Sequence, residues 1–129
     1  MLKRLKAAGA VLLLALAAAG LVRLRERMPA ADVIRKLAGL RVAVTFYRME
    51  YKTPPASFGQ VLAAGKLETV PGLKLAWHPG SAKVTDVASF RFRDTGGWAY
   101  VNDPADPQFG LVYIDCTHKD EKGRFWSEL

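Results

Sequence analysis

The chain has 129 residues, enough for one small domain once an apolar N-terminal segment is set aside. Its net charge of +7 is unevenly distributed, because residues 1–52 hold eleven basic and three acidic side chains, whereas residues 53–129 hold eight and nine. Nucleic-acid-binding proteins carry Lys and Arg on the folded domain, among aromatic side chains, so we expect no nucleic-acid partner. The single cysteine, Cys116, excludes a disulfide within the chain.

The N-terminal segment, residues 1–29, is basic at its start and then apolar. Sixteen uncharged residues separate Lys6 from Arg23. As a helix they extend about 24 Å, against about 30 Å for the hydrocarbon core of a bilayer, although long basic side chains at both ends extend that reach. Two interpretations follow: a membrane stem, or a signal peptide cut after the three alanines that precede Gly20. Positive charge directly after the apolar run disfavours the signal peptide.

An amphipathic helix is predicted over residues 30–52. Pro29 is tolerated at a helix start, and Asp32 adds a favourable negative charge to the first turn. Apolar side chains recur at alternating steps of four and three, which places on one stripe Val33, Leu37, Leu40, Val44, Tyr47 and Tyr51. The helix is expected to end before Pro54, because proline lacks an amide donor and restricts the residue before it.

The rest of the head, which we define as residues 30–129, is predicted to contain a short helix and a small sheet. Ser57 and Gln60 have capping-box spacing, which indicates a helix over residues 57–65. Apolar and polar residues then alternate between turn sequences, which predicts strands near 88–93, 97–101 and 110–116. The expected fold class is α+β, with a long N-terminal helix, its apolar stem kinked near Pro29, packed on a three-stranded antiparallel sheet.

Several short motifs follow one another in a distinctive order. An apolar helix runs into an amphipathic one, Tyr47 and Tyr51 precede a Pro-Pro-x-Ser segment, and the chain closes on Gly-Gly-Trp-x-Tyr and Trp-Ser. In this order the chain resembles a type IV pilin or a type II secretion pseudopilin. It lacks a recognisable leader motif for the prepilin peptidase, since Gly9 is followed by Ala-Val-Leu-Leu-Leu and the apolar run contains no glutamate.

The resemblance implies a structural, non-catalytic subunit of a type IV pilus or pseudopilus-like assembly. It also implies that the stem stays in the bacterial inner membrane as a single-pass anchor, with the head in the periplasm or, within a filament, outside the cell. Small side chains let such helices pack closely, so we expect self-association, or contact with other pilin-like subunits, at Val11, Leu14, Ala18, Gly20, Leu37 and Leu40. The alternative is a secreted or membrane-tethered periplasmic binding domain that does not polymerise.

Acidic residues in the C-terminal part suggest a calcium site. Asp103, Asp106, Asp115 and Asp120 offer hard oxygen ligands, and some major pseudopilins bind calcium in the loops of their C-terminal sheet. The alternative is turn chemistry, because Asp beside Pro or Gly is typical of turns and EF-hand spacing is absent. No other cofactor is expected.

The sequence indicates no catalytic or transition-metal site. It contains no Gly-x-Ser-x-Gly, phosphate loop or His-Glu-x-x-His motif, so we expect no enzyme activity. Cys116 and His118 would share one face of a strand, but His78 is the only other histidine and a metal site needs three or four ligands. The sequence therefore favours a buried, inert thiol at Cys116.

Overall fold

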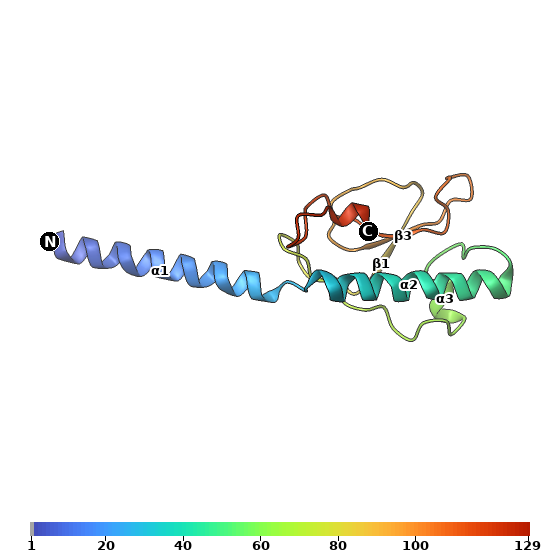
Figure 1. Ribbon diagram of the computed structural model, residues 1–129, viewed down its shortest axis with the longest axis horizontal. Coiled ribbons are helices and arrows are strands. Elements are labelled where there is room, and N and C mark those ends of the chain that lie inside the picture. The colour runs from blue at the N-terminus through green and yellow to red at the C-terminus, as the bar shows by residue number, and fades with distance from the viewer. Residues whose placement is uncertain (1) are drawn as a thin grey trace.

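The computed structural model describes residues 2–129, without the side chains of Leu2, Leu5 and residues 22–26. Its elements are α1 (Leu2–Glu26), α2 (Ala30–Tyr51), α3 (Gly59–Ala63), β1 (Val84–Val87), β2 (Trp98–Val101), β3 (Val112–Ile114) and the 3₁₀ helix η1 (Trp126–Glu128). Helix α1 projects away from the head, and α2 runs along one side of the head (Figure 1). Among the described residues, α1 contacts no other helix or strand.

Helix α2 forms one side of the core. Its apolar stripe buries Val33, Leu37 and Leu40 almost completely, and these side chains share a cluster with Trp98 and Tyr100 of β2. The helix ends at Lys52, which adopts a left-handed conformation (φ 63°) and donates its backbone N–H to the carbonyl of residue 48. Because burial of apolar surface is the main driving force of folding, this face of α2 anchors the head.

The sheet is mixed, so the prediction of a wholly antiparallel sheet is wrong. Strand β2 is central, and it pairs antiparallel with β3, with Trp98 opposite Ile114. It pairs parallel with β1, with Val84 opposite Trp98 and Val87 opposite Val101. Residues 88–97 connect β1 to β2. This segment returns the chain to the end of the sheet at which β1 begins, so the two strands run in the same direction. Local alternation of residues carries no information on that path, so it cannot predict the strand direction.

The predicted strand near 88–93 is also wrong, because that segment forms no strand. Phe90 and Phe92 pack edge-on against Tyr113, with ring centroids 4.8 and 5.4 Å away. The backbone N–H of Arg93 donates to the Asp115 carboxylate (2.6 Å) and not to a neighbouring strand. The alternating aromatic residues therefore mark a segment that covers the outer face of the sheet.

The prediction that the apolar stem spans a membrane is not supported. No helix of the described residues combines the length and the apolar content that crossing a bilayer requires. The physical reason is the charge at both ends of the apolar run, which leaves about 24 Å of uncharged helix for a core of about 30 Å. The predicted transmembrane helix, and with it the single-pass inner-membrane location, are therefore not supported. Residues 27–29 separate α1 from α2 near the predicted kink at Pro29, and of these two helices, as far as the structure describes them, only α2 packs on the sheet.

The C-terminal segment closes the head over the start of α2. The backbone N–H of Ala30 donates to Glu121 Oε1 (2.7 Å), which satisfies one of the free donors of the first helical turn. Arg41 of α2 donates from Nε to the carbonyl of Val112 (3.0 Å) and from its guanidinium to the carbonyl of Leu129 (2.9 Å). These contacts bind residues far apart in sequence into one unit.

Candidate metal centre and uncovered helix

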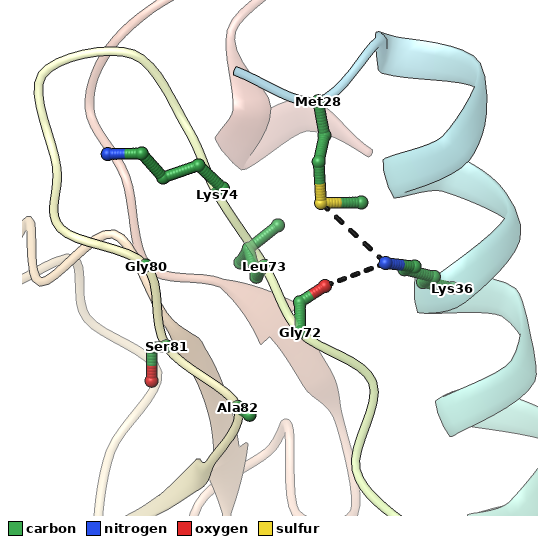
Figure 2. Close-up of a pocket in the computed structure, with 8 residues that line it drawn as sticks. All are labelled: Met28, Lys36, Gly72, Leu73, Lys74, Gly80, Ser81 and Ala82. Atoms are coloured by element: carbon green, nitrogen blue, oxygen red, sulfur yellow. Dashed lines mark hydrogen bonds between the residues drawn. The ribbon is translucent and has the colours of Figure 1, made fainter. Parts of the chain in front are cut away.

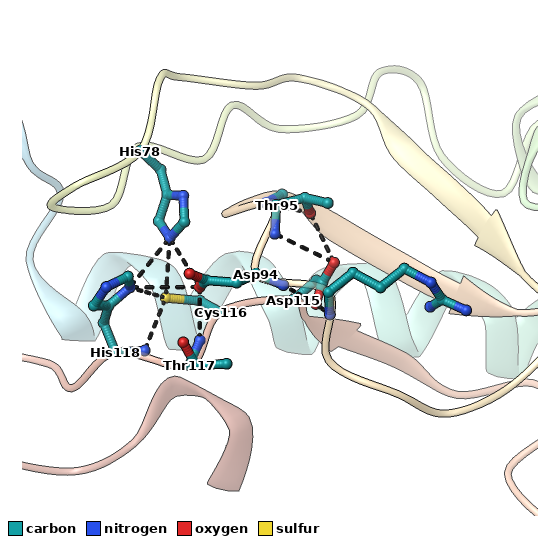
Figure 3. Close-up of polar contacts among 9 residues, drawn as sticks. His78, Asp94, Thr95, Asp115, Cys116, Thr117 and His118 are labelled. Carbon is teal, nitrogen blue, oxygen red and sulfur yellow. Dashed lines mark hydrogen bonds and ion pairs between the residues drawn. The ribbon is translucent and has the colours of Figure 1, made fainter.

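Four potential metal ligands converge at one end of the head. They are His78, Asp94, Cys116 and His118, and their ligand atoms all lie within 4.8 Å of one another. Figure 3 shows the two imidazole rings, the carboxylate and the thiol pointing toward a common centre. They come from three loops: one before β1, one before β2 and one after β3.

Five of the six separations between these ligand atoms are similar, and the sixth, between the Asp94 carboxylate and Cys116 Sγ, is within 4.8 Å. His78 Nε2 lies 3.3 Å from His118 Nδ1, 3.2 Å from Asp94 Oδ1 and 3.5 Å from Cys116 Sγ. His118 Nδ1 lies 3.4 Å from Cys116 Sγ and 3.5 Å from Asp94 Oδ1. The Cys116 residue is fully buried and the His78 side chain is 8% exposed, whereas the His118 and Asp94 side chains are 39% and 37% exposed. One side of the cluster therefore faces solvent.

His78 lies at the tip of a loop that is closed at its base. The backbones of Leu73 and Ser81 exchange two hydrogen bonds of 2.7 and 3.0 Å, and the buried side chains of Leu73 and Leu75 hold the loop to the core. Trp77, directly before His78, has a φ of 71°, which a bulky residue rarely adopts. Trp77 is 84% exposed while its neighbour His78 faces the cluster.

Asp94 is held in place by a second carboxylate. Asp115 is buried, and it accepts hydrogen bonds from the backbone N–H groups of Arg93 and Asp94 (2.6 and 3.0 Å) and from the Thr95 hydroxyl (2.9 Å). Asp94 itself has a φ of 59°. Asp115 therefore positions the loop that presents Asp94 to the cluster.

Backbone donors support the two ligands that can carry negative charge. The Thr117 N–H donates to Asp94 Oδ1 (2.9 Å), and this hydrogen bond is the main reason why the pKa of Asp94 is lowered. The His118 N–H donates to Cys116 Sγ (3.3 Å). Burial raises the pKa of the Cys116 thiol, because a thiolate is poorly solvated away from water. Burial therefore favours the neutral thiol of Cys116 as long as no cation is bound beside it.

Gly96 makes room for the His78 ring. A Cβ built at this position would lie 2.2 Å from His78 Cγ, which is far inside van der Waals contact, and the φ of 73° is itself unfavourable for other residues. The Asp-Thr-Gly-Gly sequence therefore does more than turn the chain, because it brings Asp94 and His78 together.

The sequence does not reveal this cluster because its members are far apart along the chain. Cys116 and His118 are recognisable as neighbours in the sequence, and the structure places beside them His78 and Asp94, two further groups that could hold a metal ion. Its sequence context marks Asp94 only as a turn residue. No short stretch of the sequence contains both Asp94 and Cys116, so only the fold brings these two residues together.

The four acidic residues predicted to bind calcium are used within the protein. Asp103 and Asp106 each accept a hydrogen bond from the backbone N–H two residues further on, at 2.9 and 2.8 Å. Asp115 supports the loop described above, and Asp120 forms a 2.9 Å ion pair with Arg124. Among the described residues, the candidate metal group contains none of the four. Turn and loop chemistry accounts for all these contacts.

An open pocket of about 380 Å³ lies between the start of α2 and the His78 loop. Figure 2 shows Lys36 at its edge, donating to the Gly72 carbonyl (2.9 Å) and to Met28 Sδ (3.6 Å). Backbone and small or apolar side chains make up most of the remaining lining. The pocket brings together no set of acids, bases or nucleophiles, so the cluster is the stronger candidate site.

The second unusual feature is the uncovered surface of α1. The large apolar side chains that the structure describes in α1 are exposed to 61–71%, including Val11 (66%) and Leu14 (71%), and Ala18 and Gly20 are exposed as well. The other two predicted assembly residues, Leu37 and Leu40, lie inside the head with 2% and 0% exposure. That part of the predicted assembly surface is wrong, because the sheet already covers it.

Comparison of the chain with family models, with curated proteins and with solved structures finds no match. The pilin resemblance thus stays a prediction.

Proposed function

We propose that the chain is a non-catalytic structural subunit of a pilin-like or pseudopilus-like assembly, in which α1 associates with copies of itself and displays the head. The observation that carries the proposal is the uncovered apolar surface of α1, which projects from the head and contacts no other described helix or strand (Figure 1). Large apolar side chains exposed next to one another on a helix are typical of an interaction site.

The distribution of apolar residues around α1 favours several partners over one. Leu12, Leu13 and Leu14 are consecutive, so they point to different sides of the helix, and all three are exposed to between 63% and 71%. A helix that is apolar on every side is stable when it is surrounded. Copies of the same helix provide matching surface, and the small residues that include Ala18 and Gly20 allow backbones to approach closely.

Helix α2 carries a second exposed apolar surface, within the head. On the side away from the sheet it exposes Ile34 (36%), Val42 (49%), Phe46 (53%) and Met49 (63%). Successive members are eight, four and three residues apart, which places them along one side of the helix. This stripe replaces Leu37 and Leu40 as the proposed contact of α2 with a neighbouring copy.

The test is the mass distribution of the full-length chain by analytical ultracentrifugation and chemical crosslinking over a range of concentrations. We expect multimers larger than dimers. The double change Val11→Gln and Leu14→Gln should remove them, because it places two polar amides side by side on one face of the apolar surface of α1. The matched control is Lys83→Gln, an exposed position in the head that should leave the multimers unchanged.

Two results would reject the proposal. A chain that stays monomeric at every concentration would support the non-polymerising binding domain. Multimers that persist in the Val11→Gln, Leu14→Gln variant would place the contact elsewhere. Near-ultraviolet circular dichroism of each variant shows whether the head is still folded.

A further inference from the structure

We propose that His78, Asp94, Cys116 and His118 bind one Zn²⁺ ion in a tetrahedral site that joins three loops of the head. The ligand atoms are His78 Nε2, His118 Nδ1, an Asp94 carboxylate oxygen and the Cys116 thiolate. This centre is independent of the proposed self-association, since none of its ligands lies in α1 or α2.

The spacing of the ligand atoms fits zinc better than a hydrogen-bonded network. With zinc–nitrogen and zinc–oxygen bonds of about 2.0–2.2 Å and a zinc–sulfur bond of about 2.3 Å, tetrahedral ligand atoms lie about 3.3–3.7 Å apart. Five of the six separations in the structure run from 3.2 to 3.5 Å, and the sixth, between Asp94 and Cys116, is within 4.8 Å. A charge-assisted hydrogen bond between imidazole and carboxylate would be about 2.7–2.9 Å long. Both histidine–Asp94 distances, 3.2 and 3.5 Å, exceed that range.

The ligand types select a transition metal. Two imidazole nitrogens and a sulfur suit zinc, whereas calcium takes six to eight oxygen ligands. Two neutral imidazoles, one carboxylate and one thiolate sum to a charge of −2, which Zn²⁺ neutralises. On binding, the Cys116 thiol proton is released to solvent. The exposed edges of His118 and Asp94 provide the entry path for the ion.

The role of the ion is structural. Four protein ligands fill a tetrahedral shell and leave no position for a reactive water, which distinguishes structural from catalytic zinc sites. The ion would also account for the unusual backbone around it, because Trp77 and Asp94 both have positive φ. Strained residues persist where surrounding contacts determine their conformation, and bonds to a metal supply such contacts.

The first experiment measures metal in the full-length chain, prepared without a histidine tag. Inductively coupled plasma mass spectrometry should find one zinc per chain. After removal of the metal with a chelator, Zn²⁺ at a hundredfold excess over its Kd should raise Tm by about 10 °C, and Ca²⁺ should not. Co²⁺ in the same site should give the intense visible absorption of tetrahedral coordination and a thiolate charge-transfer band in the near ultraviolet.

Variants separate a built site from adventitious binding. Cys116→Ser should abolish the charge-transfer band, and Cys116→Ser, Asp94→Asn and His78→Gln should each weaken Zn²⁺ binding by more than about tenfold. Asp106→Asn is the matched control, because that half-buried carboxylate also accepts backbone hydrogen bonds but lies outside the cluster. It should bind zinc as the unchanged protein does.

The proposal is overturned if the unchanged chain holds no zinc and its Tm does not respond to Zn²⁺. It is equally overturned if Cys116→Ser and Asp94→Asn bind zinc with unchanged affinity. Because the metal-free protein is titrated directly, these outcomes can be read even if one variant fails to fold.

Discussion

At the scale of single residues, backbone strain gathers around the proposed zinc centre. Trp77 (φ 71°), Asp94 (φ 59°) and Gly96 (φ 73°) all have left-handed conformations, and the first two each cost of the order of 1–3 kcal/mol. All three lie beside or within the cluster. The other non-glycine residue with a positive φ among the described residues, Lys52, ends α2, whereas core residues such as Trp98 lie in a regular strand.

Replacing Gly96 with alanine should disrupt the centre through the His78 ring. The new Cβ would lie 2.2 Å from His78 Cγ, in addition to the strain at positive φ. We expect a loss of more than about 2 kcal/mol in the free energy of unfolding and weaker zinc binding. Gly65→Ala is the control, because its φ is also positive (70°) but nothing lies within 4 Å. Equal losses of unfolding free energy in the two variants would contradict the proposed clash.

Two aromatic residues should differ in their contribution to stability. Trp98 is 1% exposed and its Nε1–H donates to the Pro71 carbonyl (2.9 Å), whereas Tyr47 is only half-buried. Trp98→Ala should cost about 3–5 kcal/mol of unfolding free energy. Tyr47→Ala should cost clearly less, about 1–2 kcal/mol. Urea denaturation of both variants measures the difference, and a larger loss at Tyr47 would contradict this core.

At the scale of elements, the start of α2 depends on the C-terminal segment. No side chain from the helix itself caps its first turn, and Glu121, ninety-one residues away, accepts the Ala30 N–H. That hydrogen bond lowers the pKa of Glu121; the nearby Arg27 acts in the same direction and Asp120 opposes it. A carboxylate at this end of a helix also interacts favourably with the helix dipole.

Glu121→Ala should lower the free energy of unfolding by about 1 kcal/mol at neutral pH. Because the folded pKa of Glu121 is lowered, its stabilisation is complete above the unfolded-state value of about 4.3 and is lost as the pH falls through the folded value. The difference between the unchanged protein and Glu121→Ala should therefore shrink below about pH 4. Chemical denaturation at several pH values tests this, and a difference that grows toward acid pH would refute the cap.

At the scale of the whole molecule, the head should fold without α1. The core lies within residues 30–129, and Met28 joins it by donating its N–H to the Lys74 carbonyl (2.9 Å). A chain of residues 28–129 should therefore keep the Tm and zinc content of the full-length protein but lose its multimers. Thermal melts, metal analysis and ultracentrifugation test the three parts. A random-coil circular dichroism spectrum would show that α1 is needed for folding.

The parts of the fold that could be predicted are those set by residues close together in the sequence. The helix predicted over 30–52 is observed as Ala30–Tyr51, because a stripe at helical spacing and a following proline are local signals. Alternation at Phe90 and Phe92 is a misleading signal, since packing on Tyr113 produces the same pattern as strand pairing. The parallel pairing of β1 with β2 depends on the route of the connecting chain, and no short window contains that information.

The sequence by itself determined the uneven charge, the apolar character of α1 and the amphipathic face of α2, because each is a property of composition or of spacing along one helix. The tertiary structure alone decided which apolar residues stay uncovered, leaving Val42 and Phe46 exposed while burying Leu37. It also decided that His78, Asp94 and Cys116 meet. Ligands contributed by separate loops converge only when the sheet and the core have set the positions of those loops, so the proposed zinc centre is a consequence of the complete fold.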